Sequence, residues 1–138
     1  MFGHSIRRRA FCSKRRGAAV VEFALCLPLL MLVVFGSIEV SNGVYLKQSL
    51  TAASFEIAQV ATADGGTEEA ALLRGTEVLA TYGIADYQIT ISPAVNSHTR
   101  PGTPIAVTVS ATAGANSFEV FRFFRGQRLE CTTYMNKL

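Results

Sequence analysis

The chain has 138 residues, 49% of them hydrophobic, and a formal net charge of +3. This length allows one small domain beside any membrane segment, and no linker or internal repeat divides it further. The positive charge is not spread evenly, because from Glu39 onward the chain holds seven Lys and Arg against nine Asp and Glu. The basic surplus therefore belongs to the N-terminal region, and we expect no nucleic-acid partner.

A basic leader ends at Gly17 and is followed at once by a long apolar stretch. Between Ala18 and about Ile38 the polar side chains are Glu22 and Ser37. A helix over this stretch would be about 31 Å long, which is enough to cross a hydrocarbon core of about 30 Å. Lys and Arg beside a membrane span hold their flank in the cytoplasm and attract anionic lipid. The cationic side chains of the leader are Arg7, Arg8, Arg9, Lys14, Arg15 and Arg16.

The organisation predicted from these features has three parts. Residues 1–17 form a basic cytoplasmic leader, residues 18–40 a transmembrane helix, and residues 41–138 an extracytoplasmic domain that includes the outer half of the same helix. Pro28 is tolerated within the span, since neighbouring groups can satisfy the freed carbonyl. An ordinary secretory signal has a shorter apolar core and is cut beyond it, but here no A-x-A site follows and a small-residue pair lies ahead of the core.

The junction at Gly17 and Ala18 carries a recognisable pattern. A basic leader, a glycine, and then Glu22 and Phe23 at the fifth and sixth positions of the apolar segment resemble the substrate motif of prepilin peptidases. The amino-acid sequence of residues 15–30, RRGAAVVEFALCLPLL, resembles the TadE-like branch of the pseudopilins. The resemblance continues at residues 35–40 and 50–61. The resemblance covers about a third of the chain, from Arg15 to Ala61.

This resemblance implies a function and a set of partners. It implies a minor pilin-like subunit of a tight-adherence type pilus or secretion system, cut by a prepilin peptidase between Gly17 and Ala18. The partners would be that peptidase, other pilin-like subunits, the assembly platform of the bacterial inner membrane, and membrane lipid. The alternative is an uncleaved single-pass signal-anchor protein whose outer domain binds an envelope partner. The fate of the leader separates the two.

Glu22 has two interpretations that do not depend on the family. Desolvating its carboxylate without a partner would cost on the order of a few kcal/mol. If the leader is cut, the new ammonium of Ala18 in a neighbouring subunit could neutralise this carboxylate and set the register between helices. Otherwise, Glu22 lies in the headgroup layer at little cost.

The outer part of the chain predicts an α+β fold, in which the long N-terminal helix packs with a small antiparallel sheet and one or two short helices. The helix continues to about Ala61, although Gly43 weakens it. Thr67 has the composition of an N-cap for a second helix that ends near Gly83. Alternating patterns predict strands at 87–91, 105–109 and 129–135. The helical seam that we expect to pack on this domain consists of Leu46, Leu50, Ala53, Ile57 and Val60.

The segment 116–126 is rich in phenylalanine and arginine. Asn116 and Glu119 have capping-box spacing, which favours a short helix. Either its phenylalanines pack on the sheet, or they form an exposed docking patch with the neighbouring arginines. The residues of this possible docking patch are Phe118, Phe121, Phe124, Arg122 and Arg125.

Catalytic and metal chemistry find no support in the sequence. Cys12 lies in the leader and Cys26 in the span, so Cys131 is the one exported thiol, which we expect to be a buried strand cysteine. His4 and His98 fall on opposite sides of the membrane, which leaves no zinc set on either side. No nucleophile elbow or phosphate-cradling loop is present. We therefore expect no enzyme activity, cofactor or metal.

Overall fold

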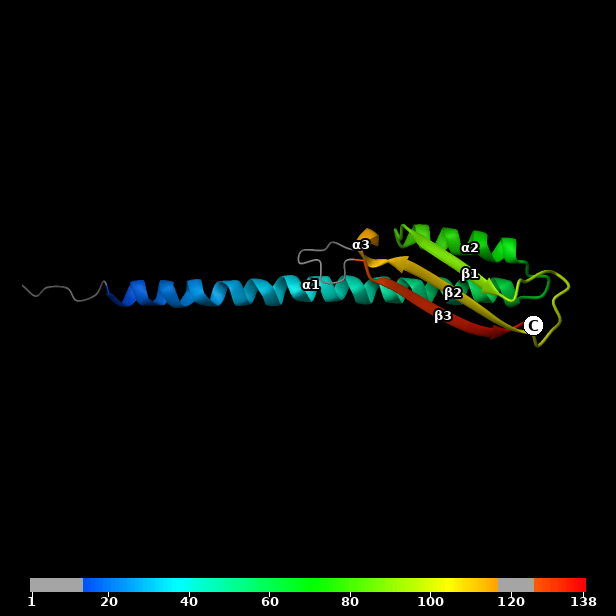
Figure 1. Cartoon of the computed structure of the whole chain (residues 1–138), viewed down its shortest axis with the longest axis horizontal. Coiled ribbons are helices and arrows are strands. Elements are labelled where there is room, and N and C mark those ends of the chain that lie inside the picture. Colours follow the sequence, from blue (N-terminus) through cyan, green and yellow to red (C-terminus); the bar gives the residue numbers. More distant parts are fainter. Residues whose placement is uncertain (1–13, 117–125) are drawn as a thin grey trace, which may run out of the picture. The chain divides into compact units, whose positions relative to one another are not determined.

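A computed structural model describes residues 14–116 and 126–138. It divides into two compact units, Met1–Phe35 and Gly36–Leu138. The elements are α1 (Lys14–Thr62), α2 (Glu68–Thr81), β1 (Tyr87–Ser92), β2 (Pro104–Thr112), α3 (Ala113–Asn116) and β3 (Arg128–Asn136) (Figure 1). The α+β fold predicted from the sequence is confirmed.

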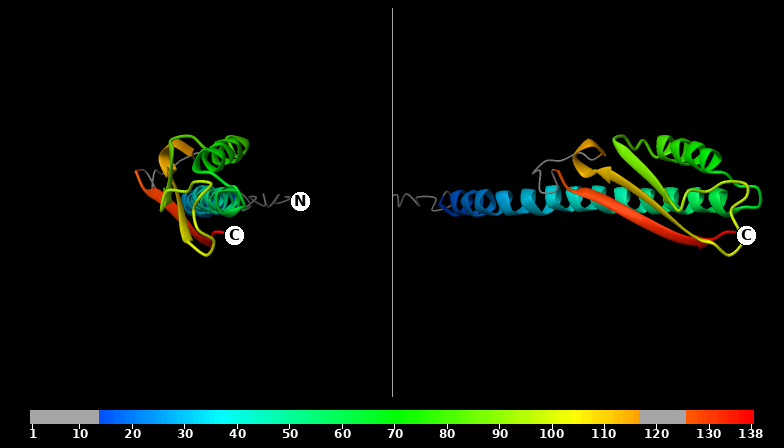
Figure 2. Two further views of the ribbon diagram at one scale, coloured as in Figure 1. Left: turned by 90° about the vertical axis from the view of Figure 1, so that its right-hand side faces the viewer. Right: turned by 45° about the vertical axis from the view of Figure 1, so that its right-hand side comes forward.

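The three strands form one antiparallel sheet in the order β1-β2-β3, visible from two further directions in Figure 2. In the central strand, Val109 pairs with Ile89 of β1 and with Cys131 of β3. Alternate residues of β2 face the core, because successive side chains of a strand point to opposite faces. The fully buried members of this inner face are Ile105, Val107, Val109 and Ala111.

The outer half of α1 supplies the other wall of the core. Leu46, Leu50, Ala53 and Ile57 are all 0% exposed, whereas Val60 is partly buried against the same cluster. The predicted seam is thus confirmed, and it packs on the domain of its own chain rather than in a coiled coil. Gly43 does not interrupt the helix, since α1 is continuous through it.

The predicted ends of α2 are also confirmed. The Ala70 N–H donates to Thr67 Oγ1 at 3.3 Å, and Gly83 adopts the left-handed conformation with φ of 68°. Tyr82 is the C-cap residue of this helix and is 38% exposed.

A buried lysine near the C-terminus closes the open end of α1. Lys137 is 5% exposed, and its Nζ donates to the carbonyl oxygens of Ala61 at 3.2 Å, of Gly66 at 3.4 Å, and of Ala63. The Leu138 N–H donates to the Thr62 carbonyl at 2.9 Å. The last carbonyls of a helix lack intrahelical donors and carry partial negative charge, so an ammonium fits them well.

Candidate processing and membrane-anchoring segment

The first half of α1 is apolar on every side and is not covered by its own chain. Every residue from Gly17 to Val34 is exposed, and Phe23, Leu25 and Leu29 keep 61%, 74% and 65% of their surface accessible. Among the residues that the structure describes, α1 is the helix long and apolar enough to cross a membrane. A helix that is hydrophobic all round needs an apolar environment. This long apolar N-terminal helix therefore suggests membrane anchoring.

The predicted cleavage site, the Gly17–Ala18 bond, lies on α1 four residues into its described part, which begins at Lys14. A Cβ added at Gly17 would meet no atom within 4 Å. The fold of the chain itself therefore does not require a glycine here. Of the leader charges, Arg7, Arg8 and Arg9 lie outside the described residues, while Lys14, Arg15 and Arg16 begin α1.

Glu22 and Phe23 follow on the same exposed helix. In the described part of the chain, both ion pairs involve Arg74, which contacts Glu56 at 3.2 Å and Glu77 at 3.5 Å. Glu22 takes part in neither. The structure thus holds the carboxylate on a bare helix surface, where a group from a neighbouring molecule can reach it.

Cys131 is less buried than the sequence predicts. It is half-buried on β3, with its Sγ 3.3 Å from Thr51 Oγ1 and 3.8 Å from Ser54 Oγ of α1. Ser54 also shares a 2.7 Å hydrogen bond with Thr133. The prediction of a buried thiol is therefore wrong in degree, because β3 is an edge strand and meets α1 through small hydroxyl side chains here instead of large aliphatic ones.

The possible docking patch Phe118, Phe121, Phe124, Arg122 and Arg125 lies outside the described residues. The predicted helix that follows Asn116 also lies outside the described residues. Asn116 itself is the last described residue before the gap and belongs to α3. Its side chain holds the backbone of Ala85, accepting from the N–H at 2.5 Å and donating to the carbonyl at 2.7 Å.

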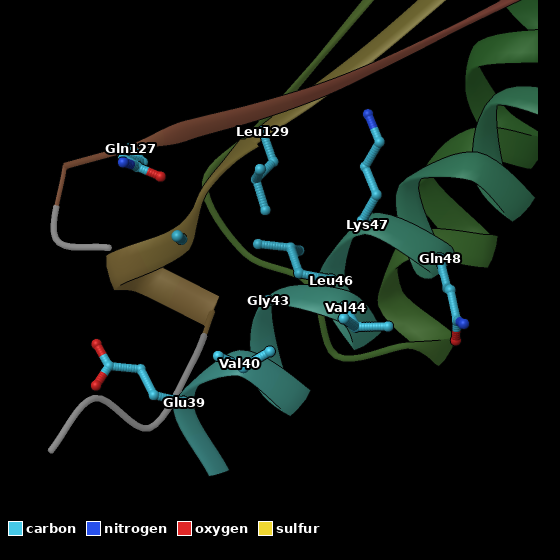
Figure 3. Close-up of a pocket in the computed structure, with 10 residues that line it drawn as sticks. Glu39, Val40, Gly43, Val44, Leu46, Lys47, Gln48, Gln127 and Leu129 are labelled. Carbon is cyan, nitrogen blue, oxygen red and sulfur yellow. The ribbon is translucent and has the colours of Figure 1, made fainter. Parts of the chain in front are cut away.

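An apolar pocket lies beside Gly43 and was not predicted from the sequence. Its volume is about 300 Å³, and its lining comes from α1, α3 and the start of β3 (Figure 3). The sequence did carry one indication of the pocket. Gly43 lies three residues before Leu46, so at helical spacing it falls on the same buried face, where it has no side chain to fill the space. In the part of the chain that the structure describes, no three His, Cys, Asp or Glu side chains gather as a metal site would need.

These features together define a class of protein. An N-terminal helix with an apolar, uncovered first half and a second half that builds the core of a small α+β domain is typical of pilin-like proteins. Residues 17–59 match the family of TadE-like proteins. This part of the chain, about a third of it, carries a TadE-like family domain. TadE-like proteins are a pilin-like family that is generally non-catalytic and implies a pilus-assembly context. No curated protein and no solved structure matches the chain.

Proposed function

We propose that the protein is a minor pilin-like structural and assembly subunit of a tight-adherence type pilus or secretion system, processed by a prepilin peptidase after Gly17. The observation that supports this most is the coincidence of three features at one place. The TadE-like match begins at Gly17, the apolar run of the sequence begins at the next residue, and a Cβ added at this glycine would meet no atom within 4 Å.

The proposed topology follows from the charge of the leader. Residues 1–17 stay in the cytoplasm, residues 18–40 cross the bacterial inner membrane, and residues 41–138 lie outside it. The peptidase would then meet the Gly17–Ala18 bond at the cytoplasmic face. Glycine is a weak helix former, which lowers the cost of unwinding α1 at that bond for the peptidase.

Removal of the leader would leave a subunit fitted for lateral assembly. The basic charges would be gone, and Ala18 would carry a new ammonium four residues from Glu22. Glu22 of one subunit and the ammonium of a neighbour are opposite charges in a medium of low dielectric, where their attraction is strong. The partners of the mature chain would be other pilin-like subunits, the assembly platform and membrane lipid.

The decisive experiment is the intact mass and N-terminal sequence of the protein recovered from membranes of cells with an active prepilin peptidase. We expect a chain that begins at Ala18. Gly17→Leu should accumulate at full length, whereas Gly36→Leu should be processed normally. Gly36 is the matched control because a Cβ there also meets no atom within 4 Å. Recovery of full-length parent alone would instead favour the uncleaved signal-anchor protein.

A further inference from the structure

The buried face of α1 has a gap where its core seam approaches the apolar segment. From Leu50 and Leu46, the line of the seam continues toward the N-terminus through position 43 to the buried Glu39, in steps of four, three and four. Leu46 and Leu50 are fully buried, but position 43 is a glycine, and a Cβ added there would meet no atom within 4 Å. The missing side chain therefore leaves empty space on the side of α1 that is otherwise filled.

This space is the pocket of about 300 Å³ seen in Figure 3. Leu129 of β3 and Leu46 of α1 point toward one another at its inner end, and Val40 and Val44 lie along its helical wall. Glu39, Lys47, Gln48 and Gln127 are the polar members of the lining. Lys47 is already engaged, because its Nζ donates to the Glu130 carbonyl.

The chemistry of the lining selects a hydrocarbon ligand. A cavity with apolar walls offers water too few hydrogen-bond partners, so it stays dry or takes an apolar guest. The volume is at the lower end of the range for small-molecule sites, about 300–1,000 Å³. One extended alkyl chain suits such a narrow site better than a bulky polar ligand does.

The position of the pocket supplies the source of that hydrocarbon. Gly43 is three residues beyond Val40, where the proposed span ends, which is about 4.5 Å along a helix. The headgroup layer on each side of a bilayer is roughly 5–8 Å thick. If α1 anchors the chain as proposed above, the pocket opens within the headgroup layer, next to the lipid chains.

We propose that this pocket binds the acyl chain of a phospholipid from the outer leaflet of the anchoring membrane. The inference rests on the membrane anchoring in the proposed function, but not on cleavage or filament assembly. A seated acyl chain completes the buried face of α1 at the position that Gly43 leaves open. It also ties the outer domain to the membrane surface by a second contact besides the helix.

The test uses the full chain in vesicles of phosphatidylethanolamine and phosphatidylglycerol, with a small share of phosphatidylglycerol that carries a diazirine in its acyl chain. After illumination and digestion, mass spectrometry locates the labelled peptides. We expect label within residues 18–40 and, separately, on pocket residues between Gly43 and Gln48 and between Gln127 and Leu129. In Gly43→Leu the new side chain fills the pocket, so the second label should be lost while the first remains.

Gly36→Leu is the matched control and should keep both labels. Gly43→Ala is the milder variant, and thermal unfolding of each protein shows whether the domain is intact. Label within residues 18–40 but none on the pocket of the parent would overturn the proposal, and so would pocket label that persists in a folded Gly43→Leu. Loss of all label would overturn the anchoring itself, and the acyl-chain site with it.

Discussion

Glu22 is a carboxylate on α1, and the residues beside it along the helix are almost all apolar. The structure leaves it exposed and outside both ion pairs of the described residues. A charge held on such a surface is costly in a bilayer unless a partner meets it. Of the two interpretations of Glu22, pairing with a neighbouring subunit makes a prediction that location in the headgroup layer does not.

Glu22→Ala is expected to leave cleavage intact and to impair assembly. The substitution makes membrane insertion easier, since it removes a charge, so any defect must come from lost pairing between subunits. Glu22→Gln keeps the size of the side chain and should show the same defect if the charge is what matters. The measurement is co-purification with partner subunits and surface filament counts at equal membrane levels. Normal filaments in both variants would favour the other interpretation, in which Glu22 lies in the headgroup layer.

Lys137 gives a second prediction at this scale. Lys137→Met should lower the free energy of unfolding by roughly 1–3 kcal/mol, because it removes charge-assisted hydrogen bonds to the end of α1 and leaves partly buried carbonyls without their donor. Lys47 is the matched control, because its ammonium also donates to a backbone carbonyl but its side chain is exposed. Lys47→Met should change stability little. Chemical denaturation of both variants checks this, and equal effects would contradict it.

Among the packed elements, α2 approaches its neighbours closely at Gly75. A Cβ at Gly75 would lie 2.6 Å from Ile57 Cδ1 of α1 and 2.9 Å from Ile89 Cδ1 of β1. Glycine in the middle of a helix is normally a loss of about 1 kcal/mol relative to alanine. Here the tight packing against both isoleucines accounts for it.

Gly75→Ala is therefore expected to destabilise the domain, although alanine is the better helix former. Overpacking of a filled core typically costs about 1–3 kcal/mol, which outweighs the gain in helix propensity of about 1 kcal/mol. Thr76→Ala, at the next and exposed position, should instead be neutral or slightly stabilising. Thermal unfolding of the two variants decides the matter, and a stabilised Gly75→Ala would show that the isoleucines can move aside.

The elements themselves could be predicted from the sequence because their signals are local. The helical seam, the Thr67 cap and the strand alternation each depend on neighbouring residues, and all three are confirmed. The contacts of Lys137, the close approach at Gly75 and the pocket beside Gly43 depend on residues far apart in the sequence. Periodicity does not report such pairs. Gly43 was visible as a helix-weakening residue, but its role as a gap in the core needed the positions of Ala113 and Leu129.

At the scale of the whole molecule, the two compact units have opposite relations to water. In the unit Met1–Phe35, residues 17–34 form an apolar helix and are all exposed. The unit Gly36–Leu138 has its own core of buried side chains. The core includes Leu46, Leu50, Ala53 and Ile57 from α1 itself. Part of α1 thus belongs to the folded domain, and its remaining part needs an apolar environment.

A fragment of residues 36–138 is therefore expected to be soluble and folded without detergent, while the full chain needs detergent or lipid. A shorter fragment, 51–138, should fail to fold, because it lacks Leu46 and Leu50. Each buried leucine contributes about 2–5 kcal/mol, and together they amount to much of a total stability of about 5–15 kcal/mol. Circular dichroism with thermal unfolding, combined with size-exclusion chromatography, compares the three proteins. Cooperative unfolding of 51–138 at the temperature of 36–138 would show that the seam of α1 is not needed for the core.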